Sequence, residues 1–170
     1  MAVSISIDYT GGLRCTATHG PSQTSIITDA PVDNHGKGES FSPTDLVATA
    51  LASCMAPAMN IKAQQKGYDM VGMKVSVEKH MSEDTPRRIV RLPVTIEVPL
   101  SPEHPDRKVL EATALACPVH QSLHPDIRDL AIEWVQTVHP ACGACLGDVG
   151  VVLLGLESNR HIALERWQLP

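Results

Sequence analysis

The 170-residue chain combines 43% hydrophobic and 19% charged residues with a formal net charge of −5, which is typical of one soluble globular domain. It has no basic run with interleaved aromatic residues, which argues against a nucleic-acid partner, and no apolar stretch that approaches the roughly 20 residues of a membrane helix. The N-terminal segment MAVSISIDYT lacks the basic start and apolar run of a signal peptide, so the sequence predicts a cytoplasmic protein.

The chain is expected to begin with three strands. Apolar and polar side chains alternate over residues 2–9, which is the period of a half-buried strand, and two consecutive glycines predict a turn after it. Residues 13–19 and 22–28 are expected to form the second and third strands. The stretch 29–42, rich in proline, glycine and short polar residues, is expected to be a loop.

A long helix is expected to follow this loop. Ser42 is a good N-cap, Pro43 suits the first helical position, and Asp45 can complete an arrangement like a capping box. Apolar residues at helical spacing continue to about Lys66, and the glycine after it can end the helix. Pro57 lies inside this helix and is expected to kink it.

The second half of the chain predicts two strands, two helices and a last strand. Alternation predicts strands at 73–77 and 91–98, and Pro93 should place the second of them at a sheet edge or at a bulge. A helix is expected at about 106–115 and another directly after Cys117. The last strand is marked by Leu130, Ile132 and Trp134.

Strands and helices do not alternate strictly, which favours the α+β class: N-terminal strands, a long central helix, a second sheet region and two further helices. From Val138 the sequence changes to a pair of cysteines, a short apolar run and a mixed end. We therefore predict one domain over residues 1–137 and a C-terminal extension of unknown role over 138–170.

Two of the five cysteines have positions that suit thiol chemistry. In a cytoplasmic chain, cysteines are expected to be reduced, catalytic or metal-binding rather than joined in structural disulfides. Cys54 lies mid-helix on the apolar face, where it is either a small buried hydrophobe or a working thiol. Cys117 lies at a predicted helix N-terminus, whose partial positive charge would lower the pKa of a thiol, or it is only a tolerated cap residue.

The setting of both cysteines resembles the OsmC/Ohr family of hydroperoxide-reducing proteins. The first motif is FSPTDLVATALASCM, which contains Cys54, and the second is CPVHQSL, which begins at Cys117. The lead-in TDAPVDNHGKGESFSP also resembles the family, and KHMSEDTPRRI is closer to the general OsmC-like branch than to the Ohr branch. The resemblance covers about residues 3–137.

This resemblance implies a dimer and a mechanism. Family members form intertwined homodimers in which the long helix of each subunit packs against the other subunit's sheet, with the active sites at the interface. By this resemblance Cys54 attacks an organic hydroperoxide and becomes a sulfenic acid, and Cys117 condenses with it into a disulfide. A dithiol reductant, of the lipoyl type for some relatives, then restores both thiols. The implied activity is that of a thiol peroxidase that needs no cofactor.

Family peroxidases also use a carboxylate and an arginine to orient the peroxide and stabilise the thiolate. Ohr-type proteins have a Glu ten positions before the first cysteine, where this chain has Thr44, and Asp45 follows one step later. Asp45 lies nine positions before Cys54, which is about 2.5 helical turns, so the two face opposite sides of one helix. Asp45 therefore acts across a dimer contact, or it only caps its helix.

Three arginines are candidates for the orienting cation. Arg14 follows the glycine turn near the N-terminus, about where Ohr relatives place their Arg, and Arg87 and Arg88 follow Pro86. Arginine suits this task because its planar guanidinium binds a carboxylate at two points and stays charged. Each of the three is alternatively an exposed surface residue.

Histidines and the remaining cysteines give weaker signals. His120 and His124 are expected one turn apart on a helix, as local bases or as surface residues, and no third metal ligand is evident beside them. His139, Cys142 and Cys145 form H-x-x-C-x-x-C, which lacks the second pair of a zinc ribbon. We therefore predict no metal site.

Two other functions are kept as alternatives. Because Thr44 replaces the Ohr-type Glu, the protein is alternatively a non-catalytic OsmC-like dimer that binds a small apolar ligand at the subunit interface. The extension 138–170 is alternatively a metal-binding or redox tail that regulates the domain. The first alternative predicts thiols that do not respond to peroxide, and the second predicts metal that is lost on truncation after residue 137.

Overall fold

The structure is a computed structural model that describes residues 2–124, 127, 132–136 and 152–154. Helices and strands are mixed without strict alternation, which confirms the α+β class. In chain order the elements are β1 (Ile5–Gly11), β2 (Arg14–His19), β3 (Ser25–Asp29), the 3-10 helix η1 (Val32–Asn34), α1 (Pro43–Gln64), β4 (Lys74–Val77), β5 (His80–Met81), β6 (Ile89–Arg91), β7 (Val94–Val98), α2 (Arg107–Leu115), α3 (Pro118–Ser122), β8 (Ile132–Gln136) and β9 (Val152–Leu154).

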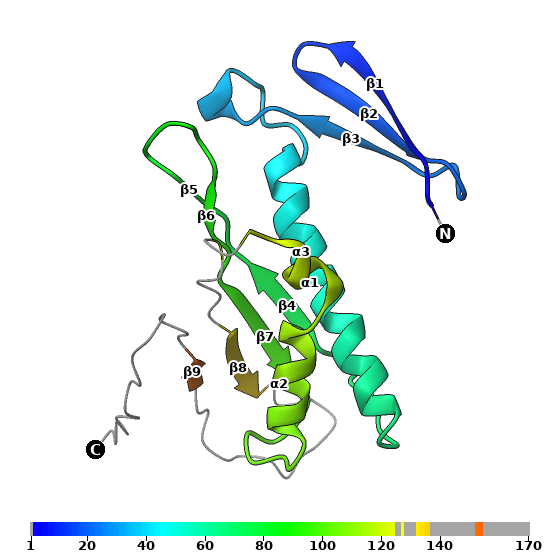
Figure 1. The fold of residues 1–170 in the computed structure, drawn as a ribbon, viewed down its shortest axis with the longest axis vertical. Helices are drawn as coiled ribbons and strands as arrows, with labels where there is room; N and C mark the ends of the chain where they lie inside the picture. Colours follow the sequence, from blue (N-terminus) through cyan, green and yellow to red (C-terminus); the bar gives the residue numbers. More distant parts are fainter. Residues whose placement is uncertain (1, 125–126, 128–131, 137–151, 155–170) are drawn as a thin grey trace.

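The N-terminal strands form an antiparallel sheet in the order β1-β2-β3, which projects away from the rest of the chain (Figure 1). Gly11 and Gly12 turn the chain between β1 and β2 with φ values of 84° and 60°, a region that side chains disfavour. Ile5, Ile7 and Tyr9 share one face of β1, and all three are exposed. The three predicted strands are confirmed, but no described residue covers their apolar face.

α1 is the long central helix that the sequence predicts. Ser42 Oγ accepts the backbone N–H of Asp45 at 3.2 Å, and Asp45 Oδ2 accepts the backbone N–H of Ser42 at 2.7 Å, which completes the expected capping box. The helix continues through Pro57 to Gln64, and the chain then turns at Gly67 with a positive φ of 89°. Local capping and turn signals therefore define both ends of α1.

A second sheet, in the order β4-β7-β8-β9, packs against α1 and α2. β7 is antiparallel to β4 and parallel to β8. Val94, Ile96 and Val98 alternate along the buried face of β7 and join one core cluster with residues of both helices. The fully buried residues of α1 in this cluster are Leu51, Met55, Met59 and Ala63.

Pro93 does not mark a sheet edge. The predicted strand at 91–98 is divided into β6, which ends at Arg91, and β7, which begins at Val94. β7 lies between β4 and β8, so the prediction of an edge strand is wrong. Pro93 lies just outside β7, where its missing N–H removes no ladder bond, and its carbonyl accepts the N–H of Glu78 at 3.0 Å.

The remaining elements follow the predicted order. α2 and α3 match the two predicted helices, and α3 begins directly after Cys117. β8 contains Ile132 and Trp134 of the last predicted strand, whereas Leu130 lies outside the described residues. β9 pairs with β8, and it is the only part of the predicted extension 138–170 that the structure describes. The domain boundary before this extension stays a prediction.

Among the described helices, α1 alone is long and apolar enough to cross a membrane by length and composition. This corrects the expectation that no apolar stretch approaches that length. The apolar face of α1 is buried against the sheet and α2, and the helix also carries Asp45, Asn60 and Lys62. The composition of α1 is therefore explained by its place in the core.

We predict that Met59→Ala destabilises the fold strongly, because Met59 is fully buried in the core between helix and sheet. Truncation of a buried methionine costs roughly 2–5 kcal/mol of unfolding free energy. Ile61→Ala, on the same helix, truncates a side chain that is 58% exposed and should cost less than about 1 kcal/mol. Urea unfolding followed by circular dichroism measures both, and equal losses would contradict this packing of α1.

Candidate functional site

Cys54 and Cys117 come from separate elements and meet at the edge of the core. Cys54 lies in the middle of α1, and Cys117 lies between α2 and α3, where α3 stands beside α1 (Figure 1). Cys117 is 1% exposed and belongs to the core cluster, whereas Cys54 is half-buried and packs against it. The two thiols are close enough for one to influence the ionisation of the other.

Burial is the main influence on the Cys117 thiol. It raises the pKa of Cys117 above the ordinary value, because a thiolate is poorly solvated in an apolar core. The backbone N–H of His120 donates to Cys117 Sγ at 3.4 Å and opposes this shift, while the Cys54 thiol adds to it. The prediction that a helix N-terminus lowers this pKa is therefore wrong in its net effect, since α3 is only five residues long and burial outweighs its terminus.

The surroundings of the pair are apolar. Met55 and Met59, which the sequence places near Cys54, are fully buried and belong to the core cluster. Val119 and Leu123, from the α3 region, are partly buried and pack against the same cluster. Together these side chains surround the two thiols with apolar surface. Such a surface favours contact with an organic group over contact with water.

Asp45 uses both of its carboxylate oxygens at the start of α1. Oδ2 accepts the Ser42 backbone N–H, and Oδ1 accepts Lys79 Nζ at 2.5 Å. Lys79 Nζ also lies 3.0 Å from Thr44 Oγ1 and 3.4 Å from Ser42 Oγ. Burial opposes ionisation of Asp45, but the hydrogen bonds from Lys79 and Ser42 outweigh it and lower the pKa of Asp45. Within one chain, Asp45 therefore caps its helix and anchors Lys79.

Lys79 is a residue that the sequence analysis missed. It follows Val75 and Val77 at a spacing of two, so it continues the inward-facing side of the strand that contains them. A lysine on an apolar face needs a carboxylate partner, and Asp45 supplies one. That break in the apolar alternation was the available signal.

Arg14 lies at the beginning of β2 and binds two carboxylates. Its Nη2 donates to Asp29 Oδ2 at 3.2 Å and to Glu39 Oε2. Asp29, the last residue of β3, is fully buried, and its Oδ2 also accepts the backbone N–H of Glu39 at 2.9 Å. That N–H, together with Arg14, lowers the pKa of Asp29 although burial opposes the shift. Arg14 is therefore held by two ion pairs and is not a freely exposed surface residue.

Two buried polar atoms of this arrangement have no hydrogen-bond partner among the described residues: Arg14 Nε and Asp29 Oδ1. A buried carboxylate oxygen without a donor costs free energy of folding, so the contacts of Arg14 and Asp29 with Glu39 have to offset this cost. Asp29 and Glu39 were also missed by the sequence analysis, because a carboxylate at a strand end and one in a loop carry no periodic signal.

The other arginine candidates pair with acids at the surface. Arg87 binds Asp33 of η1 at 2.6 Å, and Arg88 binds Asp84 of its own hairpin at 2.7 Å. The described contacts of both therefore lie away from Cys54. Within one chain, both arginines therefore form ion pairs at or near the β5-β6 hairpin, and their role at the thiol pair stays a prediction.

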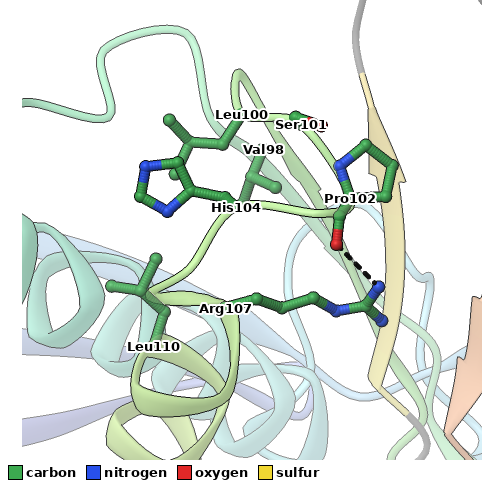
Figure 2. A pocket seen from close by; sticks show the side chains of 7 residues that line it. All are labelled: Val98, Leu100, Ser101, Pro102, His104, Arg107 and Leu110. Atoms are coloured by element: carbon green, nitrogen blue, oxygen red, sulfur yellow. Dashed lines mark hydrogen bonds between the residues drawn. The ribbon is translucent and has the colours of Figure 1, made fainter.

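Two hollows differ in what they can hold. An open hollow beside the start of α1 is lined by Gly38, Glu39, Ser40, Phe41 and Asp45, so it connects the Arg14 carboxylates with the helix cap. A small, partly open cavity of about 10 Å³ lies between the end of β7 and the start of α2, with room for about one water molecule (Figure 2). This small cavity is at the opposite end of α2 from the thiols.

The histidine and metal predictions have separate outcomes. α3 ends at Ser122, so His124 lies beyond the helix and does not share an i, i+4 face with His120, which corrects that expectation. The part of the chain that the structure describes has no group of three or more metal-binding side chains. The His139, Cys142 and Cys145 motif lies outside the described residues.

Comparison with known proteins gives one family. A family model for OsmC-like proteins matches residues 36–128, more than half of the chain. A solved structure from Psychrobacter arcticus, described as an osmotic stress induced and detoxification response protein, is 46% identical, has a TM-score of 0.70, and is matched over 75% of this chain and 92% of its own. Among curated proteins, none matches.

More distant solved structures share the fold. The organic hydroperoxide resistance protein OsmC of Legionella pneumophila is 14% identical with a TM-score of 0.65, over 81% of this chain and 98% of its own. OhrB of Bacillus subtilis, also named an organic hydroperoxide resistance protein, is 13% identical with a TM-score of 0.58, over 79% and 98%. At these identities the likeness concerns the fold alone.

We predict that iodoacetamide alkylates Cys54 faster than Cys117 in the reduced, folded protein. The reason is that Cys54 is half-buried, whereas Cys117 is buried and its pKa is raised, so its thiolate appears only at higher pH than for an ordinary thiol. Raising the pH should therefore reduce the difference between the alkylation rates of Cys54 and Cys117. Mass spectrometry of the labelled peptides measures both rates, with urea-unfolded protein as the control, and faster labelling of folded Cys117 would contradict the site.

Proposed function

Because the chain belongs to the OsmC-like family, we propose that it reduces organic hydroperoxides with Cys54 and Cys117 as its working thiols. The observation that carries the proposal is the meeting of a half-buried and a buried thiol at the edge of an apolar core. Proteins of the same fold from Legionella pneumophila and Bacillus subtilis bear the name organic hydroperoxide resistance protein, which supports it. Family membership also confirms the resemblance drawn from the two cysteine motifs.

The proposed reaction transfers one oxygen atom and two electrons. The Cys54 thiolate attacks the distal peroxide oxygen, the O–O bond breaks, and the alkoxide takes up a proton and leaves as an alcohol. Cys54 is then a sulfenic acid, which Cys117 attacks to form the disulfide while water leaves. A dithiol such as a dihydrolipoyl group reduces the disulfide by exchange and is itself oxidised. We place this cycle in the cytoplasm, where thiols are kept reduced.

The order of the two cysteines follows from their surroundings. A bulky peroxide reaches a half-buried sulfur more readily than one that is 1% exposed, which favours Cys54 as the attacking thiol. Cys117 needs to meet only the sulfur of Cys54, so burial does not exclude it from the second step. Its raised pKa makes this second step faster as the pH rises toward the pKa, because the thiolate is the attacking species.

We also propose that the working unit is a homodimer. Ile5, Ile7 and Tyr9 on β1 lie opposite or near Ala17 and Ile26 on the same face of the N-terminal sheet. The three β1 residues are about 60% exposed, so the described part of one chain leaves an apolar sheet face uncovered. A three-stranded sheet that projects from its own domain is best stabilised by a second copy of the chain, as the family resemblance implies.

The dimer would also explain the placement of the charged candidates. Arg14 lies in the projecting sheet, and Asp45 lies 2.5 turns or so from Cys54 on the opposite side of α1. Neither group contacts the thiols within the described part of one chain. A second copy that packs on the N-terminal sheet can bring Arg14 to a thiol pair, where its charge would favour the thiolate.

Cumene hydroperoxide added to the reduced protein is expected to consume two thiols and to produce a Cys54–Cys117 disulfide. Mass spectrometry of acid-quenched, alkylated peptides identifies the linkage. Cys117→Ser should stop at the sulfenic acid, which dimedone traps, and Cys54→Ser should not react. Cys15→Ser is the matched control, because Cys15 lies in β2 outside the pair, and it should react like the unchanged protein.

If both thiols survive a peroxide excess that oxidises a known thiol peroxidase, the proposed reaction is wrong. The dimer that binds a small apolar ligand is then the function to pursue, and native mass spectrometry of the purified protein would look for that ligand. Asp45, with both oxygens engaged by Ser42 and Lys79, is the feature of one chain that agrees with this alternative.

Ile7→Lys is expected to convert the dimer to a monomer, because it places a charge in the centre of the exposed apolar face of β1. Ile27→Lys is the matched control: Ile27 is similarly exposed but lies on the opposite face of the same sheet. Size-exclusion chromatography with light scattering gives the mass of each variant. A monomeric unchanged protein, or equal masses for both variants, would contradict the proposed interface.

A further inference from the structure

Two residues just beyond the C-terminus of α1 both bind one carboxylate at the start of α2. Lys66 and Tyr68 follow the C-terminus of α1, and Asp106 precedes α2. Lys66 Nζ lies 2.5 Å from Asp106 Oδ1, and the Tyr68 hydroxyl donates to Asp106 Oδ2 at 3.2 Å. We call this group, Lys66, Tyr68 and Asp106, the carboxylate clamp. It uses both oxygens of one carboxylate to join the end of α1 to the start of α2.

Because Asp106 takes part in the clamp, its side chain does not cap α2. Asp106 is the N-cap of α2, a position at which an aspartate normally accepts a backbone N–H of the first turn. Here its side chain makes no such bond, because both oxygens face Lys66 and Tyr68. The Asp106 carboxylate therefore connects α1 with α2 instead of stabilising the first turn of α2.

His104 supports the clamp from the side of the small cavity. Its Nδ1 accepts the backbone N–H of Asp106 at 3.2 Å, and its ring packs edge-on against Tyr68 with the ring centroids 5.1 Å apart. Figure 2 shows His104, Arg107 and Leu110 around the cavity that opens beside this contact. Asp106 is thus held through its backbone as well as through its carboxylate.

The packing of α2 by itself leaves its position along α1 weakly defined. α2 has nine residues, and only Leu110 and Ala114 are buried. The alanine side chain is too small to form a pronounced ridge that packs into a groove of the neighbouring helix. A helix of nine residues is also marginally stable without tertiary contacts. A directional polar contact at the start of α2 can therefore contribute to fixing its position along α1.

We propose that the carboxylate clamp sets the position of α2 along α1 and thereby holds Cys117 at disulfide-forming distance from Cys54. The inference rests on the proposed function in one respect, that these two thiols form a disulfide. Asp106 begins α2, and Cys117 lies just beyond its end; Lys66 lies just beyond α1, and Cys54 lies in its middle. The clamp and the thiol pair are therefore at opposite ends of the contact between two helices.

The demands of a disulfide make this position important. The S–S bond is about 2.05 Å long, and the two Cα atoms must lie about 4.4–6.8 Å apart with a defined dihedral angle. A slide of α2 by one residue moves Cys117 by about 1.5 Å, which uses most of that range. Lys66, Tyr68 and Asp106 are thus positioning residues that act on the thiols through α2, without contact with them.

The test is a redox titration of the full-length protein with reduced and oxidised dithiothreitol. In this exchange Cys54 and Cys117 lose two electrons and two protons, and the disulfide of the oxidised reagent becomes a dithiol. Mass spectrometry of quenched samples gives the fraction with a Cys54–Cys117 disulfide at each ratio. Asp106→Asn and Lys66→Ala should lower the equilibrium constant at least tenfold, Tyr68→Phe less, and Lys66→Arg should restore it.

The matched control is Glu111→Gln, which removes an ion pair of 2.9 Å with Arg107 inside α2 itself. It should leave the equilibrium constant within twofold of the unchanged protein. Urea unfolding of the reduced variants separates a positioning role from a merely structural one: the latter shifts the unfolding midpoint without moving the redox equilibrium of the folded protein. Tyr68→Phe, the mildest change, keeps the test valid if Asp106→Asn fails to fold.

The inference is overturned if the clamp variants match Glu111→Gln in equilibrium constant, or if the unchanged protein forms no Cys54–Cys117 disulfide with oxidised dithiothreitol. These outcomes are distinct from failure of the proposed function. A protein that forms the disulfide with dithiothreitol but ignores hydroperoxides would refute the peroxidase proposal and leave the clamp intact.

Discussion

Burial of one face of α1 fixes how β7, α2 and the two cysteines are arranged around this helix. Leu51, Met55 and Met59 project from this face and pack with β7 and α2 in a single core. Because Cys54 is adjacent to Met55, it lies at the margin of the buried face and is half-exposed. Because α2 packs along the same helix, the chain that leaves α2 returns to α1 at Cys117. The packing of α2 and α3 on α1 therefore brings the two cysteines together.

The same burial gives the two thiols different chemistry. A thiol that is 1% exposed loses the solvation of its thiolate, and the short α3 helix does not compensate for that loss. The half-buried thiol keeps access to solvent and to a substrate. This difference in burial is the basis on which we propose Cys54 as the attacking and Cys117 as the resolving cysteine. The carboxylate clamp adds polar bonds between the end of α1 and the start of α2, where we propose that they fix the position of α2.

Charged groups are concentrated in a different layer from the thiols. Arg14 with its two carboxylates lies in the projecting N-terminal sheet, and the Asp45 and Lys79 pair lies at the first turn of α1. The open hollow lined by Glu39 and Asp45 connects these two groups. Within the described part of one chain, Arg14 and Lys79 are paired with carboxylates rather than with the thiols, and the apolar face of the N-terminal sheet is exposed. The proposed homodimer would cover this face and can bring Arg14 to a thiol pair.

Local signals in the sequence, such as the Ser42 capping box and strand alternation, predicted most of the elements and the two ends of α1. They did not predict η1, the β5-β6 hairpin or β9. The pairing of Cys54 with Cys117 came from the resemblance of two motifs to the family, and it stays a prediction. Three features became evident only in the folded chain: β7 is an internal strand, the pKa of Cys117 is raised, and Asp106 binds Lys66 instead of capping α2. Each of these depends on which distant segment covers a residue. Burial is a property of the packed chain, and no local spacing specifies it.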